Sequence, residues 1–106
     1  MKSVYPLRVN GDSMAPRIPS GSLIVARPVD DATRLRVGDV VVARRPDRPD
    51  LEIVKRIQAI DPGGAIFLVG DNSAASTDSR QFGPVMRHHI QARVGWRYWP
   101  LPPIRP

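Results

Sequence analysis

Short runs of β-branched and apolar residues recur along the chain, and proline, glycine or aspartate separates each run from the next. The apolar runs are residues 22–27, 39–44, 51–60, 65–70 and 90–99. Runs of this length between turn-forming residues are typical of strands, and the 12 prolines and eight glycines argue against long helices. The pattern therefore predicts an all-β fold, either a coiled antiparallel sheet or a partly open barrel.

The polar stretches between the runs predict how the strands are connected. RPDRPD at 45–50 and DPGG at 61–64 are typical of hairpin loops. Only residues 84–91 are compatible with a short helical turn. With 106 residues and no repeat or linker, the chain is predicted to be one domain over residues 1–106.

The run 51–60 carries a lysine in an apolar row. Side chains alternate across a strand, so one face is predicted to hold Leu51, Ile53, Lys55, Ile57 and Ala59. Burial disfavours an ammonium ion and lowers the pKa of the lysine. Lys55 is thus a candidate base, and the alternative is a lysine whose stem is buried while its head reaches water near a sheet edge.

Composition excludes several kinds of site and partner. The chain has no cysteine, so disulfides and thiolate sites are excluded, and no apolar run approaches the roughly 18–20 residues of a membrane span. The N-terminal residues lack an apolar core of signal-peptide length, which predicts a cytoplasmic protein. The net charge of +6 comes from scattered arginines, which favours a solvated surface over a nucleic-acid site. Fourteen of the 16 basic residues are arginine, so a lysine in an apolar row calls for a reason.

Ser13 lies in the stretch NGDSMAP at 10–16, whose residue types are common in turns. A serine nucleophile needs a base, and the sequence offers two kinds. His88 and His89 are adjacent and expected to point apart, in a context that resembles neither a Ser-His-Asp triad nor a metal site. Lys55 has better support, because a neutral lysine could accept the proton of Ser13.

Five motifs then occur in one order: GDSMAP, GDVVV, IVKRI, GDNSAASTDSR and FGPV. In this order they resemble the type I signal peptidase family of Ser-Lys proteases, from about Val9 to Trp99. The resemblance implies the coiled antiparallel β catalytic core that this family shares with LexA-like proteases, in agreement with the strand pattern.

The resemblance also implies a role for each matching residue. Ser13 would be the nucleophile and Lys55 the general base, and neither a cofactor nor a metal would be needed. The supporting residues would be Ser76, which orients the lysine, the ion pair of Asp78 and Arg80, and the turn residues Gly70, Asp71 and Asn72. The oxyanion would be held by the turn of Gly11, Asp12, Ser13 and Met14. Gly11 occupies a position where many relatives carry a serine, so backbone N–H groups would predominate. An extended substrate would pair with strand edges at Val9, Asn10, Ile53 and Val54.

Small size, the GDSM motif and the lack of the family's N-terminal membrane segment most resemble the nickel-type superoxide dismutase maturation proteases. That resemblance implies a protein partner, the superoxide dismutase precursor, from which a short N-terminal propeptide is removed. Neither a nucleic-acid partner nor a membrane span is expected, and the sequence leaves the oligomeric state open.

Two alternatives belong to other functional classes. A LexA-like, self-cleaving repressor domain would present an Ala-Gly or Cys-Gly bond, and the chain has neither dipeptide. A basic β-barrel that binds nucleic acid could stack bases on Trp96, Tyr98 and Trp99. Against this, alternation predicts one buried face made of Ile90, Ala92, Val94, Trp96 and Tyr98. A membrane-surface contact through residues 99–106 is a further, weaker alternative.

Overall fold

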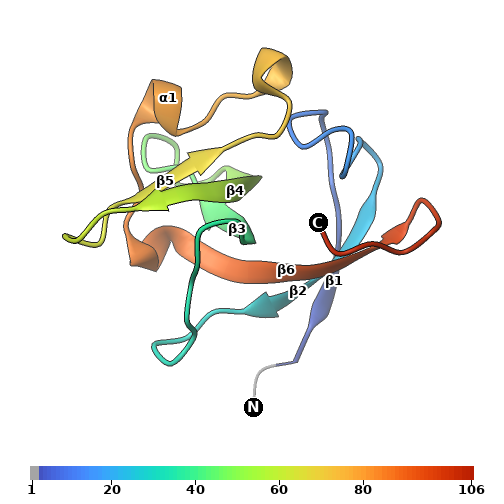
Figure 1. Cartoon of the computed structure of the whole chain (residues 1–106), viewed down its shortest axis with the longest axis horizontal. Helices are drawn as coiled ribbons and strands as arrows, with labels where there is room; N and C mark the ends of the chain where they lie inside the picture. The colour runs from blue at the N-terminus through green and yellow to red at the C-terminus, as the bar shows by residue number, and fades with distance from the viewer. Residues whose placement is uncertain (1–2) are drawn as a thin grey trace.

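One antiparallel sheet of six strands forms the fold, in the order β1-β2-β6-β3-β4-β5 (Figure 1). The computed structural model describes residues 3–106. The strands are β1 (Tyr5–Arg8), β2 (Leu23–Pro28), β3 (Val40–Arg44), β4 (Glu52–Ile60), β5 (Ile66–Val69) and β6 (Ile90–Trp99). Three short helical pieces complete it: the 3-10 turns η1 (Ser73–Ala75) and η2 (Arg87–His89), and the single-turn helix α1 (Ser79–Phe82). The predicted all-β class is confirmed.

The five predicted strands correspond to β2 through β6, and both predicted hairpins are present, β3–β4 and β4–β5. The helical turn expected within 84–91 is η2. The pattern missed β1, which is only four residues long and contains Pro6. A proline is tolerated there because β1 is an edge strand that pairs with β2 alone.

Each face of the sheet buries its own apolar cluster. Within β3, Val40 and Val42 face one cluster while Val41 and Ala43 face the other. The first cluster also contains Val9, Met14, Ile18, Ile24, Ala26, Ala92 and Val94. The second also contains Ile57, Ile66, Leu68, Val85 and Ile90. Because both faces of the central strands are covered, β3 reads as an unbroken apolar run.

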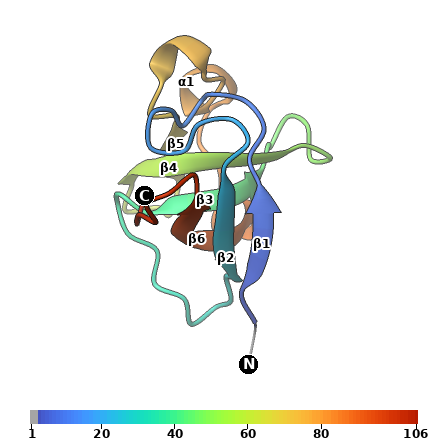
Figure 2. The same cartoon turned by 90° about the vertical axis from the view of Figure 1, so that its right-hand side faces the viewer.

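The sheet is strongly coiled, and its coiling brings distant segments together. In Figures 1 and 2 the blue loop between β1 and β2 reaches the yellow segment that follows β5. The contact is anchored by the Asn72 backbone N–H, which donates to the Ser13 carbonyl over 2.8 Å. No helix within residues 3–106 has the length and apolar character needed to cross a bilayer.

The predicted buried face of β6 is correct only for Ala92 and Val94, because Ile90 lies beyond a register shift and packs in the second apolar cluster. Ile90, Ala92 and Val94 are buried, whereas Trp96 and Tyr98 are 41% and 37% exposed. The cause is a bulge: Ala26 pairs with Val94 and Val25 with Trp96, which leaves Gly95 without a position in the ladder. An extra residue reverses the alternation beyond it. The expectation of a buried Trp96 and Tyr98 is therefore wrong.

The same bulge decides which side chain enters the core in their place. Arg97 is only 8% exposed. A second register shift, between Leu23 and Ile24, separates Arg97 from Trp99, which is 53% exposed.

Candidate active site

Lys55 lies in the middle of β4, opposite Val41 of β3, and is only 4% exposed. Its neighbour in the row, Ile57, is fully buried and Ile53 is half-buried. The predicted apolar row holds over these three residues, while Leu51 and Ala59 are exposed at its ends. At the Ala59 end the register with β5 shifts, because Ile57 pairs with Leu68 and Ala59 with Phe67.

A directed chain of hydrogen bonds starts at the lysine amine. Lys55 Nζ donates to Ser76 Oγ over 3.0 Å, and Ser76 Oγ donates to Asp78 Oδ2 over 2.6 Å. Burial lowers the pKa of Lys55, the nearby Asp78 carboxylate opposes that shift, and the cations of Arg80 and Arg45 add to it. Since burial has the largest influence, the neutral amine is favoured relative to a lysine in water.

Asp78 is a fully buried carboxylate whose charge is well compensated. Burial alone would raise its pKa, but hydrogen bonds from Arg80, Ser76 and the Gly70 backbone N–H hold the pKa of Asp78 well below its usual range. The Arg80 Nε–H donates to Oδ1 over 2.8 Å, and the Gly70 N–H to Oδ2 over 2.9 Å. Asp78 also caps α1, with Gln81 completing a capping box. An ionised Asp78 can only accept hydrogen bonds, so the Ser76 hydroxyl must donate to it.

The turn that carries Ser13 is held by the loop after β5. The Asn72 backbone N–H donates to the Ser13 carbonyl, and the Asn72 side-chain amide donates to the Asp12 carbonyl over 3.1 Å. Met14 is fully buried in the first apolar cluster, which fixes the far side of the turn. Gly11 has φ of +88°, a conformation that favours glycine.

Gly70 is the point at which three segments meet. A Cβ atom on Gly70 would lie 2.3 Å from Ser76 Oγ and 2.6 Å from the Ser13 carbonyl oxygen. Ser13 and Ser76 therefore approach the same backbone atom from segments 63 residues apart in sequence (76 − 13). The end of β5 places the turn of Ser13 and the hydrogen-bond partner of Lys55 side by side.

Sequence reasoning missed the part played by Arg56. Its guanidinium makes two hydrogen bonds to Asp71, each of 2.8 Å, and a third to the Gly38 carbonyl. This fork-shaped pair fastens the turn at 70–72 to β4, next to Lys55. The sequence did offer one signal for Arg56: side chains alternate along the run 51–60, which places Arg56 on the opposite face of the strand from Lys55.

Ser13 and Lys55 line one groove of about 430 Å³. Its walls come from the end of β1 and the following loop on one side and from residues 51–55 on the other. β1 pairs only with β2, and β5 pairs with β4 only from Arg56 to Ile60. Within residues 3–106, two strand edges thus flank the groove without a strand between them.

Backbone hydrogen bonds show which residues turn their polar groups toward this groove. The N–H and C=O of Val9 bond to Ser22 and Gly21, on the β2 side. Arg45 N–H donates to the Leu51 carbonyl and Ile57 N–H to the Asp39 carbonyl, both on the β3 side. Because backbone direction alternates along an antiparallel strand, Val54 turns toward the open edge of β4 while Ile53 turns toward β3, and the polar groups of Val9 are already bonded on the β2 side.

The two histidines do not point apart as expected. Their rings lie together, with centroids 4.1 Å apart and planes tilted by 34°, and His89 Nδ1 accepts the Met86 N–H. The adjacent-residue argument fails because η2 turns the backbone at this position. Over residues 3–106, no three side chains of His, Asp or Glu converge as a metal ion would require.

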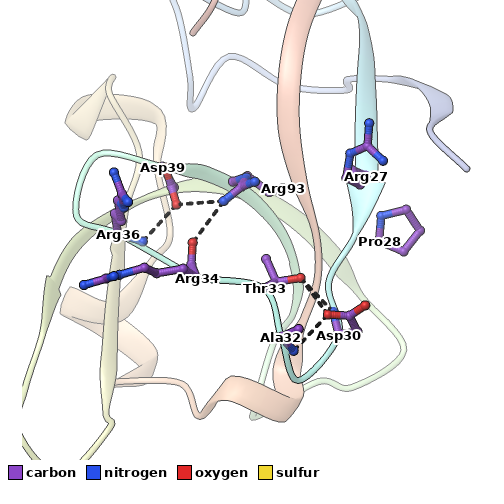
Figure 3. Close-up of a pocket in the computed structure, with 9 residues that line it drawn as sticks. All are labelled: Arg27, Pro28, Asp30, Ala32, Thr33, Arg34, Arg36, Asp39 and Arg93. Carbon is purple, nitrogen blue, oxygen red and sulfur yellow. Dashed lines mark hydrogen bonds and ion pairs between the residues drawn. The ribbon is translucent and has the colours of Figure 1, made fainter. Parts of the chain in front are cut away.

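A second hollow of about 530 Å³ lies away from this groove and shares no lining residue with it. Four arginines line it, but they do not converge: in Figure 3 the side chains of Arg34 and Arg36 point away from Arg27. Arg93 donates to the Arg34 carbonyl and lies 3.9 Å from Asp39. The arginines of this hollow either contact the loop that forms it, as Arg93 does, or point away from its centre. The candidate active site is therefore the groove of Ser13 and Lys55.

The chain is similar in sequence to known proteins. Residues 1–94 match the family model described as Peptidase S24-like. The mitochondrial ATP-independent inner membrane protease subunit 1b of Arabidopsis thaliana is 33% identical over 91% of this chain and 70% of its own length. The mitochondrial inner membrane protease subunit 1 of Xenopus tropicalis is 32% identical over 92% of this chain and 70% of its own. Signal peptidase I of Bacillus caldolyticus is 51% identical over 40 residues, which are 38% of this chain and 22% of that protein.

Proposed function

The chain belongs to the Peptidase S24-like family and is a serine peptidase, and from that premise we propose a Ser-Lys endopeptidase with Ser13 as nucleophile and Lys55 as general base. One observation carries the proposal: a buried lysine, with its pKa lowered by burial, shares a groove with a serine in a fixed turn. A lysine in its neutral form is able to activate a hydroxyl.

The hydrogen-bond chain supports this assignment of roles. Ser76 donates to Asp78 and accepts from Lys55, so one N–H of the amine is committed to Ser76. The lone pair of the neutral amine is then available for the Ser13 proton. In the proposed reaction Ser13 Oγ attacks the scissile carbonyl, Lys55 takes the hydroxyl proton and passes it to the leaving amine, and water hydrolyses the acyl-enzyme.

The turn around Ser13 offers a limited set of oxyanion donors. The Gly11 N–H donates to Ser20 Oγ over 3.0 Å, so that group is already in use. In the described part of the chain, the Ser13 N–H has no hydrogen-bond partner. We assign the oxyanion to the Ser13 N–H, at the position where preorganised backbone donors stabilise an acyl-transfer intermediate.

The open edges of β1 and β4 supply the proposed substrate track. An extended peptide lying between them could pair with the backbone of Asn10 on one side and Val54 on the other. The backbone directions favour Val54 over Ile53, and Val9 is less suitable than Asn10 because its N–H and C=O already bond to Ser22 and Gly21. A peptide held there would cross the groove past Ser13.

The proposed substrate is a precursor protein from which the enzyme removes an N-terminal propeptide. The motif resemblance names nickel-type superoxide dismutase as the candidate precursor, and a cytoplasmic location remains part of this proposal. The relatives carry the name of mitochondrial inner membrane proteases, so their own substrates are a second panel to test.

The test is cleavage of candidate precursors followed by intact-mass analysis. Wild-type protein should release a propeptide, and Ser13→Ala should release none while keeping its fold by circular dichroism. Ser73→Ala is the matched control, because Ser73 is an exposed serine in η1. Turnover by a folded Ser13→Ala protein would overturn the nucleophile assignment, and self-cleavage of wild-type protein at pH 9–10 would favour the repressor-like alternative.

A further inference from the structure

Arg97 is a buried cation that forms no ion pair with any residue the structure describes. The bulge at Gly95 turns it into the first apolar cluster, opposite Ile24. Within residues 3–106, no carboxylate lies within ion-pair distance of its guanidinium. Burying an unpaired charge is unfavourable, so an arginine at this position calls for an explanation other than packing.

In the described part of the chain, the hydrogen-bond partners of the Arg97 side chain are all backbone carbonyls. One terminal nitrogen donates to the Arg17 carbonyl over 2.7 Å and the other to the Pro102 carbonyl over 3.0 Å. Its Nε is buried and has no partner among the described residues. The guanidinium thus links β6 to two segments: the turn after Ser13 and the chain after β6.

The Arg17 carbonyl belongs to the turn that carries Ser13. This turn closes with the Ile18 N–H donating to the Met14 carbonyl over 2.9 Å, and both side chains are fully buried. Outside the loop between β1 and β2, two described residues hydrogen-bond to residues 12–18: Asn72 on one side and Arg97 on the other. The turn is therefore clamped at both ends from distant parts of the sheet.

We propose that Arg97 is a positioning residue for Ser13, which fixes the nucleophile turn from inside the core through the Arg17 carbonyl. The proposal rests on the proposed role of Ser13. An arginine suits the position because its planar fork can hold two carbonyls at once and its charge persists at every pH at which the enzyme works. Through the Pro102 carbonyl, the same side chain joins the segment after β6 to the nucleophile turn.

The test compares Arg97→Met, which keeps a long apolar stem without donors, with Arg97→Lys, which keeps a charge without the fork. Arg93→Lys is the matched control: Arg93 lies on the same strand and also donates to a carbonyl, that of Arg34, but away from the groove. The readouts are kcat and KM for a cleaved precursor, the pH profile, and hydrogen exchange of the Ile18 amide.

We expect Arg97→Met to lower kcat about 10- to 100-fold, because small misplacements of a reacting group have effects of this size. KM should stay nearly unchanged, because the substitution leaves the edges of the groove untouched. The apparent pKa of the pH profile should also stay unchanged. The kcat of Arg97→Lys should lie between those of Arg97→Met and the wild-type protein, and the kcat of Arg93→Lys should equal that of the wild type. The Ile18 amide should exchange faster in both Arg97 variants, since its hydrogen bond closes the turn.

Wild-type kcat and wild-type Ile18 exchange in a folded Arg97→Met protein would overturn the proposal, as would slow turnover with unchanged exchange. If Arg97→Met does not fold, Arg97→Lys decides between the same outcomes. Faster Ile18 exchange would support the clamp even if the wild-type protein cleaved no precursor, a result that would count against the proposed function instead.

Discussion

Among residues 3–106 two cations are buried, Lys55 on β4 and Arg97 on β6, and they differ in the kind of group to which they donate hydrogen bonds. Lys55 donates to a hydroxyl that is itself bonded to a carboxylate. The groups to which Arg97 donates, among the described residues, are backbone carbonyls. Burial lowers the pKa of Lys55, so this residue can act as a proton acceptor. An arginine keeps its proton, so Arg97 can hold backbone groups but cannot exchange protons with a substrate.

The difference shows that burial alone does not identify a catalytic cation. What separates the two sites is the partner: a titratable network that ends at Asp78 beside Lys55, and uncharged carbonyls around Arg97. The lysine site suits proton transfer and the arginine site suits geometry. Substitutions that exchange the two side-chain types should therefore have unequal effects.

The largest expected effect is that of Lys55→Arg. Arginine keeps the positive charge but cannot accept a proton near neutral pH, so cleavage should fall by roughly 100- to 10,000-fold, the range of general-base contributions. The measurement is propeptide release by intact mass, with folding checked by circular dichroism. Arg97→Lys, the reverse exchange, should cause a smaller loss.

Lys55→Met is the control for packing, because it keeps a long unbranched side chain without a basic group. It should fold and be as inactive as Lys55→Arg. A folded and active Lys55→Arg enzyme would remove the distinction between the two buried cations and with it the proposed mechanism.

Much of the Lys55 site could be predicted from sequence, and the Arg97 site could not. Ser13, Lys55 and Ser76 lie in motifs, and simple alternation along 51–57 places the lysine in an apolar row. Arg97 faces the core only because of a bulge at Gly95, which reverses the alternation and exposes Trp96. A bulge depends on the pairing with β2, which is information that no single strand contains.

The role of Arg56 shows a second limit. Alternation places Arg56 on the opposite face of β4 from Lys55, but it does not reveal the partner Asp71, which lies 15 residues away across a hairpin. Strand β1 was missed for a related reason, since four residues with a proline give too little pattern to detect. Local periodicity reveals faces, whereas contacts between loops require the assembled sheet.

Ser76→Ala should have the next largest effect. Without its hydroxyl the lysine amine loses the partner that orients it, and a positioning loss of about 10- to 1,000-fold in kcat is expected. Residual activity should remain, because Ser76 transfers no proton. The assay is propeptide release under saturating substrate, with Ser73→Ala as the control; unchanged kcat in Ser76→Ala would mean that the hydrogen-bond chain to Asp78 does not serve catalysis.

The pH dependence of the cleavage rate should report the titration of Lys55 and not that of Arg97. The base must be neutral, so the wild-type rate should rise about tenfold per pH unit below an apparent pKa and then level off. Because burial lowers the pKa of Lys55, the midpoint should lie below the roughly 10.4 of a lysine in water. Arg97→Lys should leave that midpoint unchanged, since no interaction with Arg97 shifts the pKa of Lys55; a midpoint at or above 10.4 in the wild-type protein would contradict a desolvated base.

Acid should destabilise the site of Lys55 and Asp78 at a higher pH than the site of Arg97. The folded pKa of Asp78 is depressed, so its stabilising contribution is fully present above the unfolded value of about 3.9 and is lost as pH falls below that value. Opening of this site, which lets Asp78 take up a proton, should therefore become easier as the pH falls. Arg97 is held by carbonyls that do not titrate, so the turn at 14–18 has no such local dependence.

Hydrogen exchange at pH 6 and pH 3 can measure this difference, after correction for the intrinsic rate at each pH. Protection of the Gly70 amide, which donates to Asp78, should fall more than protection of the Ile18 amide. Asp78→Asn should reduce the Gly70 protection at pH 6 and make it less dependent on pH, because an amide oxygen accepts the bond without a charge. Equal losses of protection at the Gly70 and Ile18 amides would contradict this prediction. They would show that acid unfolds the sheet as one unit and that the sites of Lys55 and Arg97 open together.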